Sequence, residues 1–119
     1  MVYDKVIEAF HLMWGNFPEP VMLVHKNRDI LAVNKSCSNA GGVAGRKCSD
    51  NGSPEQHKGC LANQALATQQ AKYTKHKAGE REIIGYWIPV TGYSEIFVHF
   101  GIGTTIDYNA TSEEVENIK

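Results

Sequence analysis

The sequence predicts an α+β fold, in which a five-stranded antiparallel sheet carries helices on one face, with an N-terminal amphipathic helix and a C-terminal exit helix. Three observations support this prediction. A helical apolar pattern opens the chain, two short β-rich runs around a turn follow, and three further strand-like runs joined by turns occupy the last third. Strands joined by short turns pair antiparallel, and helices then cover a face of the sheet.

The first predicted element is a helix over residues 2–14. Apolar side chains recur three and four positions apart along it and form one apolar face. Gly15 and Asn16 end this pattern. Pro18 and Pro20 then favour extended backbone, so we expect a strand to follow directly.

A β-hairpin comes next, with strands at residues 21–25 and 30–33 around the turn-forming letters KNRD. Residues 34–54 are polar and rich in glycine, and they predict only loops and short helical turns. A helix over about residues 55–70 follows, because Pro54 and an acidic residue favour a helix start.

The last third predicts three strands, at residues 71–78, 81–90 and 96–108. The final strand is apolar on both sides, with Ile96, Val98, Phe100 and Ile102 on one side and Phe97 on the other. One side is expected to pack against the helical section. The other side must be covered by the N-terminal helix or by a second subunit.

A C-terminal exit helix is expected after this strand. Acidic residues follow a candidate cap there, a pattern typical of a helix start. We expect Asp107 and Asn109 to end the last strand and to help cap the exit helix.

The bulk composition predicts one ordinary globular domain. The chain has 119 residues, of which 42% are apolar and 21% charged, with a formal net charge of −1. Lysine and arginine are scattered, which argues against nucleic acid as a partner.

We expect a cytoplasmic protein with no membrane insertion of this segment, because no apolar run approaches about 18 residues and no signal-peptide core is present. The three cysteines predict thiols or ligands rather than a disulfide framework.

The order of elements resembles the PAS sensory domain over nearly the whole chain. The letters FPEPVMLVHKNRDILAVNKS resemble the opening hairpin of that family, which typically ends in an asparagine, here Asn34. GGVAGRK resembles the segment that ends in a glycine, here Gly45, and GYWIPV resembles the penultimate strand, which commonly ends in a proline, here Pro89. GIGTTIDYN is similar to the closing strand, with Asp107 where the family often has Asp-Ile-Thr, although Tyr-Asn replaces Ile-Thr here.

The resemblance implies a sensor rather than an enzyme. It divides the chain into a flanking helix at residues 1–16, a sensor domain at 17–109 and the start of a C-terminal linker helix at 110–119. Such a domain binds a small ligand or cofactor between its sheet and its central helices, or responds to redox state. It signals through dimer and terminal-helix contacts to an output domain or partner protein, whether it stands alone or belongs to a larger protein.

No catalytic residue is expected, because no Ser-His-Asp order, phosphate loop or close carboxylate pair stands out. The alternative is a cofactor-free module for dimerisation or protein interaction.

A candidate cofactor site lies in the middle of the chain, where Cys48, His57 and Cys60 fall within 13 residues. His57 and Cys60 lie side by side if they share a helix, and the intervening loop favours a chain reversal that brings Cys48 close to Cys60. Cys37 is a possible fourth ligand. Thiolate and imidazole ligands suit zinc or an iron–sulfur cluster. The resemblance adds haem, since some haem-binding PAS sensors take an axial histidine from this region. The alternative is that the thiols are small buried hydrophobes.

Two further histidines, His25 and His99, stand on predicted strands among apolar neighbours. A histidine in such a place is more often hydrogen-bonded in the core or at an interface than a ligand. In the PAS family the first and last strands are neighbours, so the two side chains line the ligand pocket together if they point the same way.

A homodimer is also predicted. The apolar stripe of Val6, Phe10 and Met13 on the first helix, together with the two-sided last strand, offers more apolar surface than one small monomer needs. We expect the first helix to lie at the dimer interface.

Overall fold

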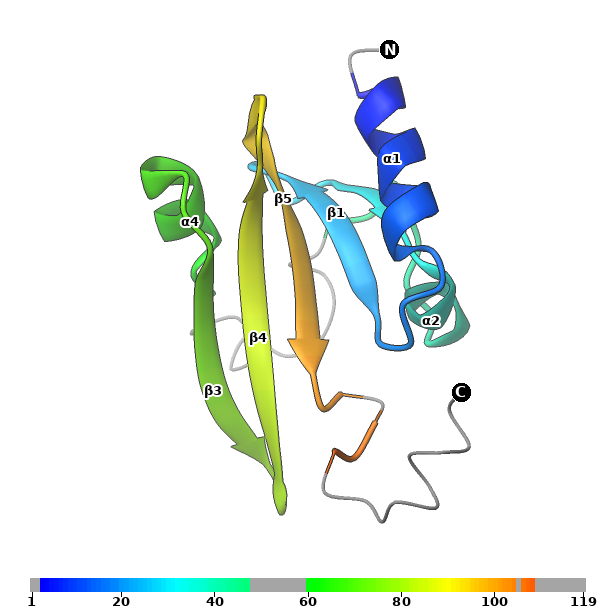
Figure 1. Cartoon of the computed structure of the whole chain (residues 1–119), viewed down its shortest axis with the longest axis vertical. Coiled ribbons are helices and arrows are strands. Elements are labelled where there is room, and N and C mark those ends of the chain that lie inside the picture. The colour runs from blue at the N-terminus through cyan, green and yellow to red at the C-terminus, as the bar shows by residue number, and fades with distance from the viewer. Residues whose placement is uncertain (1–2, 48–59, 105, 109–119) are drawn as a thin grey trace.

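The computed structural model describes residues 3–47, 60–104 and 106–108. Its centre is a five-stranded sheet with the order β2-β1-β5-β4-β3, in which neighbouring strands are antiparallel (Figure 1). The predicted fold class is therefore confirmed. The strands are β1 (Val21–His25), β2 (Ile30–Val33), β3 (Lys72–Ala78), β4 (Arg81–Val90) and β5 (Tyr93–Ile102), and the described helices are α1 (Asp4–Trp14), α2 (Lys35–Asn39) and α4 (Ala62–Thr68). Within the described ranges, no helix is long and apolar enough to cross a lipid bilayer.

Helix α1 covers one face of the sheet, which we call the outer face, and it packs against β1 and β2. Val6 and Phe10 are buried against this face, whereas Leu12 and Met13 are 80% and 76% exposed. The prediction that Val6 and Phe10 form a dimer stripe with Met13 is therefore wrong, because the sheet of the same chain already buries the first two. The outer-face core is completed by Val21, Leu23, Ala32, Ile96, Val98 and Phe100.

Helix α4 packs on the opposite face, which we call the inner face. Ala62 and Ala65 of this helix are buried with Val24, Trp87 and Phe97 from the sheet. Because side chains alternate along a strand, Phe97 points away from its neighbours Ile96 and Val98, which belong to the outer-face core. The predicted two-sided character of the last strand is confirmed.

The predicted helix over residues 55–70 is wrong at its centre. Cys60 and Leu61 are not helical, and α4 begins only at Ala62. Both residues instead pack against the inner-face cluster from a segment that precedes the helix. The helix ends at Gln69, whose backbone is left-handed. Residues 48–59 lie outside the described residues.

Strand β5 ends at Ile102 rather than near residue 108, so Asp107 does not end the strand as predicted. The reason is Gly103, whose φ of +97° turns the chain out of the sheet. A Cβ at this position would also lie 2.7 Å from the carbonyl oxygen of Glu82 on β4, so glycine is required. Asn109 and the expected exit helix lie outside the described residues.

Asn34 joins the first helix, the linker and the hairpin. Its side chain is 1% exposed. Its Oδ1 accepts the backbone N–H groups of Val21 and Cys37, each at 2.9 Å, and the second of these bonds caps α2. Its amide nitrogen donates to the backbone oxygens of Trp14, Phe17 and Glu19, at 3.2, 3.1 and 2.9 Å. The Asn34 side chain therefore fixes the end of α1, the linker after it and the start of α2 relative to β1.

Candidate functional site

A pocket of about 700 Å³ opens on the inner face of the sheet. Two glycines form part of its floor. Thr74, Gly85 and Gly101 stand in one cross-strand row on β3, β4 and β5, and all three line the pocket. Glycine within a strand often marks a place where another group approaches the backbone. Neighbouring side chains do approach the backbone here, because a Cβ at Gly85 would lie 3.4 Å from the Trp87 indole and one at Gly101 would lie 2.7 Å from the Thr104 hydroxyl.

The next cross-strand row holds two stacked rings. Trp87 and His99 are register partners, and their ring centroids lie 4.9 Å apart at an interplanar angle of 18°. The Nδ1 atom of His99 lies 2.8 Å from the backbone oxygen of Tyr86. Because a carbonyl oxygen only accepts, Nδ1 carries the proton, and in the neutral ring Nε2 is the accepting nitrogen. The pocket thus has a flat aromatic wall whose imidazole has a defined orientation.

The polar part of the lining is made of donors and cationic groups. Thr74, His76 and Lys77 come from the edge strand β3, and Thr104 comes from the turn after β5. Among the described residues that line the pocket, none is an aspartate or glutamate. The electrostatics of this lining favour a neutral or anionic occupant over a cation.

The register places His25 and His99 on opposite faces. Across β1 and β5, His99 pairs with Met22, whereas His25 pairs with Ile96. Met22 and His25 are three residues apart on one strand, and an odd offset reverses the face. The predicted pairing of the two histidines therefore does not form, and only His99 lines the pocket.

His25 is held on the outer side near α1. Its Nδ1 accepts the backbone N–H of Asn27 at 3.2 Å, and its Nε2 lies 3.3 Å from Oε2 of Glu95. Its ring meets the ring of Tyr3 edge-on at 5.9 Å. Lys26 and His25 both lower the pKa of Glu95, Lys26 more strongly. His25 therefore joins helix, hairpin and last strand, which is a structural role.

The cysteines divide into two groups. Cys37 is buried and lines the pocket, and burial raises the pKa of its thiol. Cys60 is partly exposed and packs against the inner-face cluster. Cys48 and His57 lie outside the described residues, so the cluster with Cys60 stays a prediction. Because Cys60 is not helical, the helical spacing no longer supports its pairing with His57. Among the described residues, no group of three His, Cys, Asp or Glu side chains is placed to hold a metal ion.

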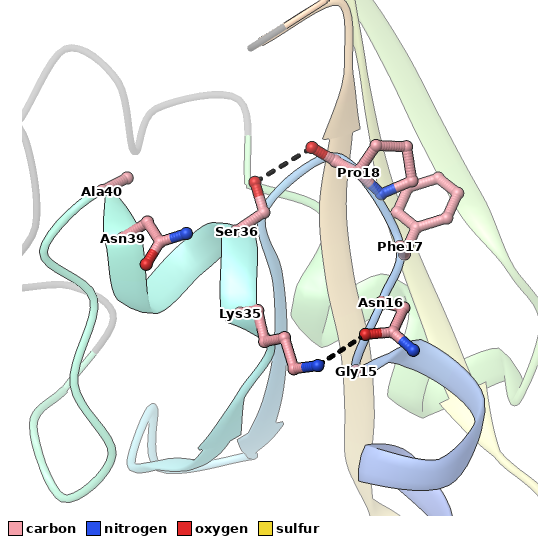
Figure 2. A pocket seen from close by; sticks show the side chains of 8 residues that line it. All are labelled: Gly15, Asn16, Phe17, Pro18, Lys35, Ser36, Asn39 and Ala40. Carbon is pink, nitrogen blue, oxygen red and sulfur yellow. Dashed lines mark hydrogen bonds between the residues drawn. The ribbon is translucent and has the colours of Figure 1, made fainter. Parts of the chain in front are cut away.

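A second depression, of about 530 Å³, lies where the end of α1 meets α2 (Figure 2). Its polar groups bind one another. The Lys35 ammonium donates to Oδ1 of Asn16 at 2.7 Å, and the Ser36 hydroxyl donates to the backbone oxygen of Pro18 at 3.0 Å. These bonds connect α2 to the linker after α1, so we regard this depression as a structural joint.

Sequence reasoning missed the glycine floor and one buried acid. Gly85 and Gly101 interrupt otherwise apolar strands, a signal that points to close approach of another group. Glu19 is fully buried just before β1, although glutamate is almost never fully buried unless paired. Its position between two prolines gives no sign of the partners it has in the fold.

Comparison with known proteins identifies the fold. No protein-family model and no curated protein matches the sequence. Among solved structures, a domain of an HTR-like protein from Haloarcula marismortui is 23% identical over 74% of this chain and 99% of its own, with a TM-score of 0.60. The PAS domain of BvgS from Bordetella pertussis is 16% identical over 97% of this chain and 95% of its own, with a TM-score of 0.66. A sensory box sensor histidine kinase from Vibrio cholerae is 13% identical over 85% of this chain and 91% of its own, with a TM-score of 0.60. The sheet order, the helix on each face and these likenesses agree that the chain has the PAS fold.

Proposed function

We propose that this chain is a PAS-type sensory module that binds a small molecule in its inner-face pocket. The observation that carries the proposal is the pocket itself, which combines a glycine floor with the stacked pair of Trp87 and His99. A concave site with aromatic walls and a few convergent polar groups is the usual form of a small-molecule site. The likeness to a PAS domain and to a sensor histidine kinase supports a role in signalling.

The ligand class proposed is a flat molecule with a carboxylate or similar anionic group. A flat ring fits beside Trp87, whose indole forms one wall. The hydroxyl of Thr74, the imidazole of His76 and the ammonium of Lys77 offer donors on the β3 side. A carboxylate therefore gains favourable contacts that an uncharged analogue lacks.

Calorimetry with a matched pair of ligands tests this proposal. Benzoate and benzamide share shape and ring, but only benzoate is anionic. We expect benzoate to bind more tightly than benzamide, and Lys77→Gln to reduce this preference. Equal affinity for both compounds in the unchanged protein would contradict the anionic ligand class, and no binding of any aromatic compound would contradict the pocket as a ligand site.

The protein purified without oxygen tests the cofactor predictions. Its absorption spectrum and metal content report directly on haem, an iron–sulfur cluster or zinc. Stoichiometric metal that is lost in Cys60→Ser would support the predicted Cys48, His57 and Cys60 site. A colourless, metal-free protein that still binds benzoate would support the small organic ligand.

We also propose that the module acts as a homodimer. Leu12 and Met13 on α1 and Tyr73 on β3 are large apolar side chains that are 80%, 76% and 65% exposed. Tyr73 continues a row of aromatic contacts across the outer face, because its ring lies 6.0 Å from Tyr86, which stacks on Phe100 at 5.1 Å. A second copy would cover this apolar surface and would give the proposed signal a path between subunits.

A further inference from the structure

A buried carboxylate connects the two ends of the domain. Glu19 lies between α1 and β1 and is fully buried. It accepts the backbone N–H of Gly103 at 2.5 Å and that of Ile106 at 3.3 Å. Burial and, to a smaller extent, Glu19 raise the pKa of the Tyr108 phenol, so this residue also lies near the carboxylate. The two backbone donors, Gly103 and Ile106, lie 84 and 87 residues after Glu19 in the sequence. The chain therefore enters and leaves the sheet at one carboxylate.

The same turn forms part of the pocket wall. Gly101 and Thr104 line the pocket on either side of Gly103, and Pro20 lines it beside Glu19. The Arg81 guanidinium donates to the Gly103 oxygen at 3.2 Å, and the Thr104 hydroxyl donates to the Gly101 oxygen at 3.2 Å. The pocket and the carboxylate thus share one short turn, which β4 also holds in place.

We propose that Glu19 is a latch that couples the inner-face pocket to the exit segment, by which we mean Gly103, Thr104 and the residues from Ile106 to Tyr108. A molecule in the pocket that displaces the turn at Gly101 and Thr104 also displaces the N–H of Gly103 from the carboxylate. A buried carboxylate that loses a donor is strongly disfavoured. We therefore expect the exit segment to be either bound to Glu19 or released from it, with no stable arrangement in between. The coupling rests on the proposed ligand pocket, whereas the latch itself does not.

Amide exchange measured by NMR tests the latch in the ligand-free protein. Glu19→Gln keeps the shape of the side chain but removes the charge and one acceptor oxygen. We expect the amides of Gly103 and Ile106 to exchange at least about tenfold faster, which matches the loss of a hydrogen bond to a charged group. The matched control is Glu8→Gln, an exposed residue of α1, which should leave both amides unchanged. Unchanged exchange in Glu19→Gln would overturn the latch.

Tyr108→Phe keeps this test decisive if Glu19→Gln does not fold. Tyr108 is 54% exposed, so the loss of its hydroxyl leaves the fold intact while it removes a polar group near Glu19. We expect the Ile106 amide to exchange about threefold faster in this variant. No change at Ile106 would overturn the latch in that case.

A pocket-filling substitution tests the coupling without any ligand. Thr74→Phe adds bulk to the pocket from β3, in the same cross-strand row as Gly85 and Gly101. We expect the amide exchange of Gly103 and Ile106 to change by at least about threefold. Lys75→Phe is the control, because it adds the same side chain on the opposite face of the same strand. Normal exchange in Thr74→Phe would overturn the coupling, even if Glu19→Gln confirmed the latch. Because no arm uses a ligand, a failure to bind benzoate remains a separate result.

Discussion

Gly85 of β4 stands directly opposite Gly101 of β5 on the inner face of the sheet. The Trp87 indole approaches Gly85 and the Thr104 hydroxyl approaches Gly101, at 3.4 and 2.7 Å from where a Cβ would stand. The next inner-face row holds Trp87 and His99, so aromatic rings follow the glycines within two residues along each strand. This relationship places the pocket beside the turn at which the chain leaves the sheet.

Gly85→Val should narrow the pocket. Valine suits a β-strand better than glycine does, but its Cβ would lie 3.4 Å from the Trp87 indole, so this ring must shift and we expect the free energy of unfolding to change by less than about 1 kcal/mol in either direction. Benzoate affinity should fall at least about tenfold, which is about 1.4 kcal/mol of binding free energy. Calorimetry and urea unfolding measure the two quantities, with Ile84→Val as a control on the outer face. A variant that is stable and still binds benzoate normally would contradict the glycine floor.

Asn34→Ala should destabilise the protein by at least about 3 kcal/mol, because it leaves several buried backbone groups without a partner. Asn34→Asp keeps the accepting oxygen but removes the donors, so it should also be strongly destabilising. Asn39→Ala is the control on the same helix, where the residue is exposed, and it should change stability by less than about 0.5 kcal/mol. Urea unfolding measures the free energy of unfolding of all three variants. Equal stability of Asn34→Ala and Asn39→Ala would refute this role.

Cys37 should react slowly with iodoacetamide at pH 8 in the native protein. The thiolate is the reactive form, and burial both hides the sulfur and raises the pKa of the thiol. The raised pKa favours folding at pH values below the unfolded pKa, and this contribution disappears as the pH rises through the higher folded pKa. Mass spectrometry of labelled peptides follows the rate, and urea-unfolded protein gives the unprotected reference. Equal rates in the native and unfolded protein would contradict the burial of Cys37.

Met13→Asp should weaken the proposed dimer and leave the monomer folded, since Met13 is 76% exposed. Phe10→Asp should instead unfold the protein, because Phe10 is 3% exposed. Val43→Asp provides the control, since this exposed valine lies in the segment after α2, outside α1 and the strands. Sedimentation equilibrium with circular dichroism separates these results. A folded Met13→Asp protein that associates like the unchanged chain would exclude α1 from the interface.

The sequence was a good guide where neighbouring residues decide the structure. The predicted bounds of β1, β2 and β4 agree with the structure, because turn-forming residues delimit each apolar run. The start of α4 and the end of β5 were missed, because packing of Leu61 and the close approach of Gly103 to β4 decide them. Such tertiary contacts leave no local pattern.

The candidate site was predicted only in part for the same reason. His99 was singled out and lines the pocket, but the face of His25 depends on strand register. The partners of Glu19 come from the far end of the chain, and no sequence spacing predicts them. Cys48 and His57 lie outside the described residues, so their predicted site awaits the metal analysis.

Chemical-shift mapping with benzoate tests the central claim most directly. In isotope-labelled protein, the account predicts that the largest shifts appear at Thr74, Gly85 and the indole N–H of Trp87, with smaller shifts at the Gly103 amide. Intermolecular contacts between the benzoate ring and Trp87 should be visible by the nuclear Overhauser effect. Shifts that gather instead on the outer face, around Met13 and Tyr73, would contradict the inner-face pocket as the sensing site.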